Sequence, residues 1–523
     1  MIPEDVRSRP IERIARLREA VPLDERDPLW LGLSLLPGFV AVAVYLATNP
    51  YPAYGAGLYV QIAATIGENG FAPPAFVSGY AVPVRFAYPP LQFYVLAALL
   101  DLGFDPLTVT RFLPAVGVVA GLIPAYLLGR DYTGSRAAGT ATAAMIALNP
   151  QVLEWHVSAG GVVRAFAFLY ALTAVYAGYH VFTDGGWRAT AVGVVAVALT
   201  GLTHPTYALF VVSSYLVLWV GFDRSLRGFA RGIAVGLGAV ALASPWIAWV
   251  LTTHGPDAFT AAAGTHGGIG GGVFALLAGE GTTHALVAFA AAVAAFVVRR
   301  DAVIAGWTVV VTLLFYQARF GYAVAALAVA VVGVGIAERA ANGGETPGAL
   351  ATPERRATVA AVLVILASVG GGAALAAEMT LVTDPTTPSF VDEDSVAAAE
   401  WAATETPDDA TFVVIGDAAE WFPALSDRTI LIGPWGVEWA STPTYDRQLD
   451  AFEDISACKS RTCVETVASS VDADPDYVVI PKGRYTVRGD TVVQFGVLER
   501  SFERSSWELA YENDGVVVYR ATD

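Results

Sequence analysis

Seven side chains near the ends of apolar runs are of types that could act on a charged or hydroxyl-bearing substrate. Arginine presents a planar fork of donors that matches paired anionic oxygens. Glutamate and histidine can take or give a proton. The candidates are the arginines Arg85, Arg164 and Arg319, the acid–base residues Glu68 and His156, and the further histidines His204 and His266.

The three arginines also fit structural roles. Arg319 could cap a helix or end an apolar run, and Arg164 could pair with Glu154. Arg85 could lie free in a loop. A guanidinium buried without a partner is costly, so a carboxylate partner for Arg319 would argue against an anion-binding role.

The acid–base candidates have structural alternatives as well. Glu68 fits a turn at a helix end, and His156 fits a loop end. Glu154 and His156 stand two positions apart and do not share a helix face, so joint action requires a loop or a strand-like turn. His204 precedes Pro205 and therefore marks a helix start, where a neutral imidazole is favoured. It is either structural or a substrate contact.

Composition indicates the elements that must position these side chains. Of the 523 residues, 55% are hydrophobic and 15% are charged, whereas soluble domains carry about 25% charged residues. Repeated apolar runs approach the roughly 20 residues that cross a bilayer. We therefore predict a multi-spanning membrane protein whose Ala-, Val- and Gly-rich helices pack closely.

Arginines in the short connections predict the orientation of the apolar runs. The runs cover 30–49, 88–104, 108–128, 136–150, 160–182, 188–202, 205–221, 229–252, 283–298, 302–316, 320–337 and 357–378. The positive-inside rule places the connecting arginines in the cytoplasm. If successive connections alternate between the two sides of the membrane, residues 88–128 must cross it an odd number of times. Either 88–104 is interfacial or re-entrant, or a neighbouring short run does not cross, which gives about 11 spans.

This orientation places the loops 50–87, 150–160, 202–205, 252–283 and 316–320 on the outer face. Four histidines fall in these segments, which favours a polar cavity there, unless they merely end loops: they are His156, His204, His254 and His266. The glycine-rich stretch Thr265–Gly272 fits either a mobile loop that closes over a ligand or a plain linker.

Three parts follow along the chain. Residues 1–28 form a cytoplasmic tail, 29–382 the membrane domain with outer loop 50–87, and 383–523 an extracytoplasmic domain. In the last part, strand and helix patterns alternate, which predicts a small α/β domain. The expected strands are 411–416, 428–433, 476–481, 507–512 and 515–520, and the expected helices are 395–404, 445–456 and 461–470.

The two cysteines of the chain, Cys458 and Cys463, both lie in this last part. A pair without other thiols in an outer domain predicts a disulfide. A metal site would require further ligands near by.

The balance of acidic and basic residues indicates the kind of organism that the chain comes from. The net charge is −17, and only two of 31 basic residues are lysines, Lys459 and Lys482. An acidic, lysine-poor surface suits a salt-rich environment and indicates a halophilic archaeon. A high-GC genome would explain the lysine count but not the acidity.

Four motifs together resemble the membrane glycosyltransferases of the GT-C type, which take sugars from polyprenyl-phosphate carriers. The first outer loop runs from AATIGENG (63–70) to YPPL (88–91), and GLTHPTY (201–207) is similar to a Thr-His-Pro step of archaeal members. YQARF (316–320) places an arginine at the outer end of a late span. EWFPALSDR (420–428) and GVEW (436–439) resemble the outer C-terminal domain of such proteins.

The resemblance implies a polytopic α-helical membrane domain followed by a small extracytoplasmic α/β domain. It implies that Arg319, with Arg164 and Arg85 as further candidates, binds the carrier phosphate, and that a base takes a proton from the acceptor hydroxyl. The family carries an acid early in the first outer loop as a base or metal ligand. Here that stretch, Tyr54–Tyr59, holds no acid, and Glu68 is the remaining acid of the loop.

The implied partners are the membrane, a polyprenyl-phosphate carrier and a glycan, lipid or protein acceptor, and no nucleic acid is expected. A divalent metal stays open as a cofactor. Two other functions also stay open. One is a catalytically inactive relative that binds the carrier or a glycan, or scaffolds surface-glycan assembly. The other is a transporter, which the absence of an internal repeat disfavours.

Overall fold

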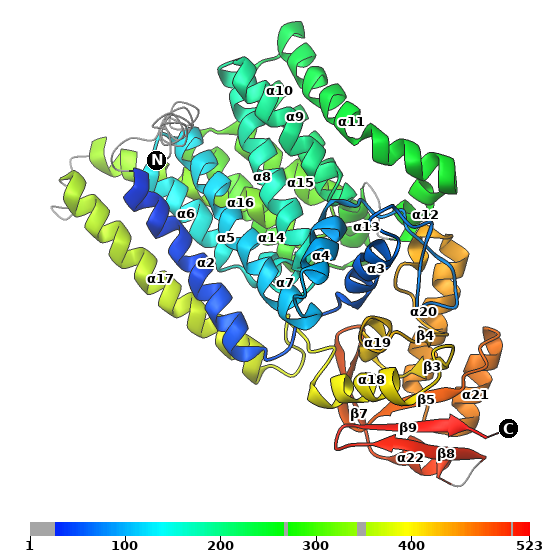
Figure 1. Cartoon of the computed structure of the whole chain (residues 1–523). Coiled ribbons are helices and arrows are strands. Elements are labelled where there is room, and N and C mark those ends of the chain that lie inside the picture. The colour runs from blue at the N-terminus through cyan, green and yellow to red at the C-terminus, as the bar shows by residue number, and fades with distance from the viewer. Residues whose placement is uncertain (1–26, 266–269, 343–351, 504–505, 523) are drawn as a thin grey trace, which may run out of the picture.

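The computed structural model describes residues 27–265, 270–342, 352–503 and 506–522. A bundle of helices, α2 to α17, is followed by a smaller domain built around a sheet (Figure 1). All but two residues of the expected cytoplasmic tail, and His266, lie outside the described residues.

Eight helices of the described chain are long and apolar enough to cross a membrane. They are α2 (Asp27–Thr48), α5 (Pro106–Thr133), α8 (Gly161–Thr183), α10 (Pro205–Phe222), α11 (Leu226–His254), α14 (Thr282–Arg299), α16 (Ala318–Asn342) and α17 (Pro353–Leu381). Three apolar helices are shorter: α4 (Leu91–Asp101), α9 (Trp187–Gly201) and α15 (Ala302–Leu314). The chain is a multi-pass membrane protein, and the number of about 11 spans remains a prediction.

Two of the apolar runs do not form one long spanning helix in the structure. The run 88–104 contains only α4, whose 11 residues extend about 16 Å, roughly half of a bilayer core. The run 136–150 is divided into α6 (Arg136–Ala147) and α7 (Pro150–Val157). The break has a local cause, because Pro150 disfavours helical backbone before it and Asn149 caps the new helix by accepting the Gln151 N–H at 3.0 Å.

One end of the bundle is rich in ion pairs. Asp27 at the start of α2 accepts from Arg130 at 2.9 Å and from Arg136 at 2.8 Å. Asp131 accepts from Arg130 at 2.6 Å and lies 3.3 Å from the His180 ring. These residues stand at the ends of α5 and α8 and the starts of α2 and α6, at the opposite end from the C-terminal domain (Figure 1).

The C-terminal domain contains a five-stranded mixed sheet in the order β4-β3-β5-β9-β8. The strands are β3 (Thr411–Val414), β4 (Thr429–Ile430), β5 (Tyr477–Pro481), β8 (Trp507–Glu512) and β9 (Val516–Ala521), at the places that the sequence predicts. Strand β3 pairs in parallel with β4 and β5, and β9 is antiparallel to β5 and β8. Consecutive buried residues such as Phe412–Val414 show that helices cover both faces.

The three expected helices of this domain are also present, as α18 (Glu393–Glu405), α20 (Thr442–Ala457) and α21 (Arg461–Ser470). Elements that the sequence analysis missed are the hairpin β6 (Gly483–Val487) and β7 (Asp490–Gln494) and the short helices α19 (Phe422–Ser426) and α22 (Val497–Phe502). The expected disulfide is confirmed: Cys458 and Cys463 are bonded, with their Cα atoms 5.6 Å apart, at the junction of α20 and α21.

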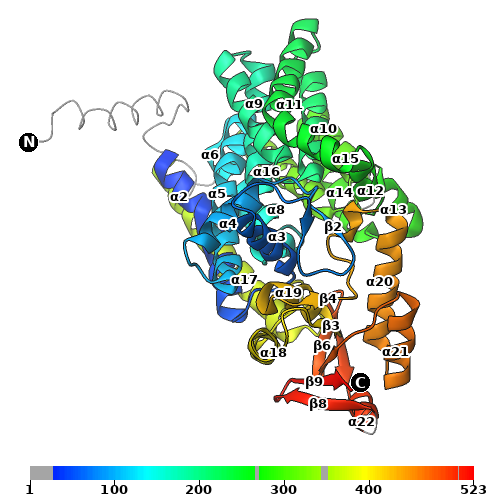
Figure 2. The ribbon, with the colours of Figure 1, turned by 45° about the vertical axis from the view of Figure 1, so that its right-hand side comes forward.

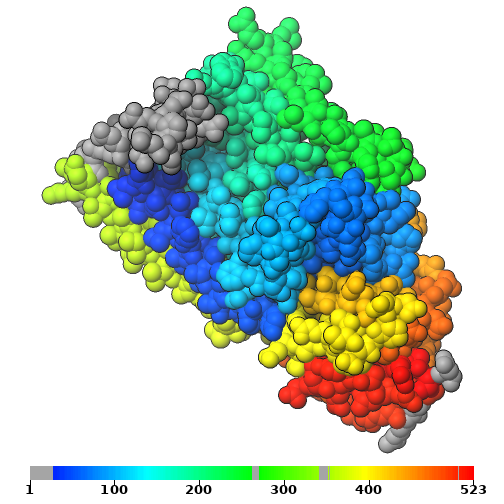
Figure 3. All heavy atoms as spheres, in the orientation of Figure 1, coloured from blue at the N-terminus to red at the C-terminus, as the bar shows by residue number. Residues whose placement is uncertain are grey.

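Residues 50–87, the loop that the sequence places on the outer face and that is called the first outer loop below, contact both domains. The loop holds α3 (Gly57–Glu68) and the two-stranded ribbon β1 (Phe76–Val77) and β2 (Val84–Arg85). Its backbone bonds to the C-terminal domain at two places, since Tyr54 N–H donates to Pro388 at 2.8 Å and Ala81 N–H donates to Ile430 at 3.0 Å. Figure 2 shows α3 between the spanning helices and α19, and Figure 3 shows the C-terminal domain packed against this loop.

Candidate functional site

Four helices and the first outer loop meet on the side of the bundle that faces the C-terminal domain. Arg164 lies in the first turn of α8, His204 caps α10, Arg319 is the second residue of α16, and His156 lies near the end of α7. Four of the seven residues singled out in the sequence therefore gather in one region.

Arg319 and Arg164 carry the positive charge of this region. Arg319 is 6% exposed, its guanidinium carbon lies 5.4 Å from the centre of the Tyr207 ring, and its Nε atom has no hydrogen-bond partner in the described chain. The guanidinium of Arg164 lies 4.9 Å from the Trp155 ring. Within the described residues neither arginine forms an ion pair, and their charges act on each other. The pair is suited to bind an anion.

His156 holds Tyr207 beneath Arg319. The histidine is 2% exposed; its Nε2 atom lies 2.7 Å from the Tyr207 hydroxyl, and its Nδ1 atom bonds to the Val152 carbonyl. A carbonyl only accepts, so Nδ1 carries the hydrogen and Nε2 accepts from Tyr207. Both ring nitrogens are occupied, and this geometry makes His156 a positioning residue for Tyr207.

Tyr54 connects the loop to the membrane domain. Its hydroxyl donates to Glu154 at 3.1 Å, and its ring stacks on Trp155 at 4.5 Å. Its carbonyl accepts from the Trp421 indole at 3.2 Å, and its φ is 59°. This left-handed conformation costs a non-glycine residue about 1–3 kcal/mol, so contacts from both domains must hold it. Glu154 bonds to Tyr54 and forms no ion pair with Arg164.

His204 stands at the start of α10, as its position before Pro205 predicts. Its Nδ1 atom accepts the Thr206 N–H at 3.3 Å. Its ring lies against Tyr88 and Tyr207, with ring centres 5.8 and 5.1 Å away. The histidine thus bridges the first outer loop and the aromatic side chain under Arg319.

Two glutamates of the C-terminal domain face the same region. Glu420 ends the short 3₁₀ turn Asp417–Glu420 and is buried, and Glu438 lies half-buried in the turn Val437–Trp439. Burial, with repulsion from Asp417, raises the pKa of Glu420 to about 8, although Arg164 opposes the shift. Burial raises the pKa of Glu438 to about 7.

These raised pKa values imply that alkaline pH weakens the folded state. A carboxyl whose pKa is higher in the folded than in the unfolded chain stabilises folding fully below its unfolded value of 4.5, and that stabilisation is lost as the pH rises through 7 to 8. We expect the unfolding temperature, followed by tryptophan fluorescence, to fall from pH 5 to pH 9. The double variant Glu420→Gln, Glu438→Gln should flatten this dependence, and the control Glu68→Gln should not. An unchanged slope in the double variant would contradict this assignment.

Three residues from the sequence analysis are not part of this cluster. Glu68 is exposed at the far end of α3, about 16 Å along the helix from Gly57. Arg85 lies half-buried on β2, where its charge acts on His254. His266 lies outside the described residues. Tyr207, Glu420 and Glu438 lie in motifs that are recognisable in the sequence. The motifs alone do not indicate a role for these three residues.

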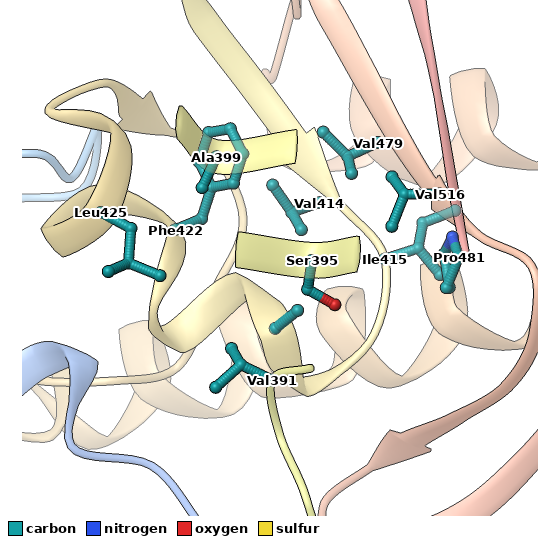
Figure 4. Close-up of a pocket in the computed structure, with 11 residues that line it drawn as sticks. Val391, Ser395, Ala399, Val414, Ile415, Phe422, Leu425, Val479, Pro481 and Val516 are labelled. Atoms are coloured by element: carbon teal, nitrogen blue, oxygen red, sulfur yellow. The ribbon is translucent and has the colours of Figure 1, made fainter. Parts of the chain in front are cut away.

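Two of the hollows in the described part of the chain lie elsewhere. One, between α18, α19 and the sheet, is lined by apolar side chains apart from Ser395, whose hydroxyl bonds to Asp392 at 2.6 Å (Figure 4). It offers no converging polar groups. The other lies between α13 (Gly271–Ala278), α14 and the start of α16 and includes Tyr316 and Gln317.

Within the described ranges, no three His, Cys, Asp or Glu side chains are placed to hold a metal ion together. The histidines and carboxyls of the site, which are residue types that can bind a metal, stand apart from one another in the described chain. We therefore derive no step through a metal.

No protein-family model matches this chain, and no curated protein matches it. Solved structures do. ArnT from Cupriavidus metallidurans bound to undecaprenyl phosphate has a TM-score of 0.56 at 13% identity, over 93% of this chain and 98% of ArnT. The arabinofuranosyltransferase AftD from Mycobacteria has a TM-score of 0.53 at 16% identity, over 96% of this chain and 40% of AftD. The chain therefore has the GT-C fold.

Proposed function

We propose that this GT-C-fold chain transfers a sugar from a polyprenyl-phosphate carrier to the hydroxyl group of a glycan, lipid or protein acceptor at the extracytoplasmic face. The observation that carries the proposal is the pair of arginines Arg319 and Arg164, which lie where spanning helices meet the C-terminal domain and form no ion pair within the described residues. A carrier of this chemistry, undecaprenyl phosphate, is bound to ArnT in its solved structure.

Burial explains why Arg319 favours an anion. Arg319 is only 6% exposed, and its Nε hydrogen has no acceptor in the described chain. Such a group is expensive unless a ligand compensates its charge and accepts its hydrogen bonds. A phosphate monoester or diester can do both, because the guanidinium fork matches two of its oxygens.

The transfer then follows from charge development. The acceptor oxygen forms a bond to the anomeric carbon while the bond from that carbon to the carrier phosphate breaks. The electron pair leaves with the phosphate, whose growing charge Arg319 and Arg164 stabilise. The acceptor hydroxyl releases its proton to a base. In this proposal Tyr207 holds Arg319 in place, and His156 and His204 position Tyr207; Arg85, Glu68 and His266 have no assigned step.

The extracytoplasmic position of the C-terminal domain is part of the proposal. It is supported by the arginines at the opposite end of the bundle, which the positive-inside rule assigns to the cytoplasm. We expect a membrane-impermeant maleimide to label Cys458 and Cys463 on intact cells only after reduction. Labelling that requires permeabilised cells would place the domain inside and contradict this topology.

A transfer assay tests the function itself. The purified chain in liposomes is given dolichyl-phosphate hexoses and pentoses with radiolabelled sugars, together with octyl glycosides as hydroxyl acceptors. We expect a labelled product and release of dolichyl phosphate from at least one donor. Binding of dolichyl phosphate without transfer from any donor would instead support a catalytically inactive relative, the candidate that the acid-free stretch Tyr54–Tyr59 favours.

A further inference from the structure

Glu420 reaches from the C-terminal domain into the first outer loop beside Gly55. A Cβ atom added to Gly55 would lie 1.5 Å from Oε2 of Glu420 and 2.3 Å from its Oε1. A Cβ atom added to Gly57 would lie 2.0 Å from the Glu420 carbonyl oxygen. The carboxyl of Glu420 therefore occupies the space that a side chain of residue 55 would enter, and the glycines make this approach possible.

This carboxyl has no ionic partner of its own within the described residues. Its backbone partner is the N–H of Leu58 at the start of α3, a helix whose N-cap residue, Ala56, offers no side-chain acceptor. The titratable and charged groups that face the Glu420 carboxyl from the elements packed around it are Asp417, Glu438, Arg164, Tyr59 and Tyr80. Burial, the repulsion of Asp417 and the attraction of Arg164 together leave its pKa at about 8, so it exchanges its proton near neutral pH.

Buried donors without acceptors mark the same interface. The Trp439 indole N–H and the Tyr80 hydroxyl have no hydrogen-bond partner in the described chain, and Trp439 is 6% exposed. The Trp439 ring lies 5.5 Å from that of Tyr88, and the charge of Glu420 acts on Tyr80. Buried polar groups are nearly always satisfied in native proteins. Unused donors beside aromatic faces are suited to a hydroxyl-rich ligand.

We propose that Glu420 is the catalytic carboxylate of the sugar transfer, supplied to the first outer loop by the C-terminal domain, and that the acceptor binds on the side of Tyr80 and Trp439. The role rests on the proposed function. Ionised Glu420 takes the proton of the acceptor hydroxyl as its oxygen bonds to the anomeric carbon, and the carrier phosphate leaves with the electron pair. Glu420 then releases the proton to water.

Arg164 connects the two halves of this site. Its charge acts on Glu420 and Glu438 on one side and on Arg319 on the other. Its Nη1 atom lies close to Gly160, which is itself near the Gly55 carbonyl. A phosphate held by Arg319 and Arg164 would thus lie on the other side of Gly55 from the Glu420 carboxyl. The sugar donor would approach from the side of the arginines, and the acceptor from the side of Glu420.

The test uses the full-length chain in liposomes with the donors and octyl glycosides described above. Glu420→Gln keeps the side-chain volume and an acceptor for Leu58 N–H. We expect it to lower turnover by about 100- to 10,000-fold while binding of dolichyl phosphate stays unchanged. The wild-type rate should rise with pH up to about 8, and this rise should vanish in the variant. Glu400→Gln, exposed on α18 of the same domain, is the matched control with wild-type turnover.

A relocation variant separates chemistry from folding. Glu420→Gly should abolish transfer, and adding Gly55→Asp to it should restore part of the rate, because the new carboxyl enters the same space. Wild-type turnover in Glu420→Gln, or no recovery in the folded double variant, overturns the role of Glu420 and leaves the proposed function standing. Absence of transfer by the wild type from every donor overturns the proposed function and this role together.

Discussion

Arg319→Ala is expected to weaken binding of dolichyl phosphate and undecaprenyl phosphate by about 10- to 100-fold, since each hydrogen bond to a charged group contributes about 1.5–3 kcal/mol. The chain should remain folded, because within its described part the guanidinium contacts aromatic rings and no carboxylate. Glu154, whose charge acts on Arg319, keeps its hydrogen bond from the Tyr54 hydroxyl in this variant. Photo-crosslinking or tryptophan quenching by each carrier in liposomes measures the effect.

Two further variants make this result specific. Arg319→Lys should recover only part of the affinity, because lysine keeps the charge but loses the planar fork. Arg300→Ala removes an exposed arginine at the far end of α14 and should bind both carriers as the wild type does. Equal binding by Arg319→Ala and wild type would show that the carrier phosphate lies elsewhere.

Gly57→Ala is expected to destabilise the contact between the first outer loop and the C-terminal domain by roughly 3 kcal/mol. The new Cβ atom would lie 2.0 Å from the Glu420 carbonyl oxygen and 2.5 Å from the Trp421 Cα atom. These are backbone atoms that cannot rotate away, and overpacking of this kind costs about 1–3 kcal/mol or more. Thermal unfolding and limited proteolysis of the C-terminal domain measure the loss, and transfer should fall with it.

Gly67 provides the control in the same helix. A Cβ atom there meets nothing within 4 Å, so Gly67→Ala should be neutral or stabilise the chain by up to about 1 kcal/mol. Both substitutions replace a glycine of α3 by alanine, and they differ chiefly in what the methyl group meets. If Gly57→Ala behaved as Gly67→Ala does, the close packing of Glu420 on the loop would be wrong.

The sequence allowed much of the fold to be predicted because its signals are local. Apolar runs of suitable length correspond to the spanning helices, and the expected strand segments correspond to all five strands of the main sheet. Two local signals were overlooked. Asn149-Pro150 marks the break between α6 and α7. Arg488-Gly489, with φ values of 55° and 88°, forms the two-residue turn of the β6–β7 hairpin.

The site was accessible to sequence reasoning only in part. Arg164, His156, His204 and Arg319 could be found because each is a polar residue at the end of an apolar run. The approach of Glu420 to Gly55 could not be found, because it joins residues of two domains far apart in the chain. Two glycines spaced as Gly55 and Gly57 are common in loops for many reasons. Only the structure shows that here they leave room for the side chain and backbone of Glu420.

The central claim, that Arg319 and Arg164 bind the carrier phosphate beneath the C-terminal domain, is tested most directly by a cryo-electron microscopy map of the chain with dolichyl phosphate in a lipid nanodisc. We expect phosphate density within hydrogen-bond distance of both guanidinium groups, next to the Tyr207 ring and across Gly55 from Glu420. Phosphate density remote from both arginines, or either guanidinium paired with a carboxylate in the occupied protein, would contradict the account.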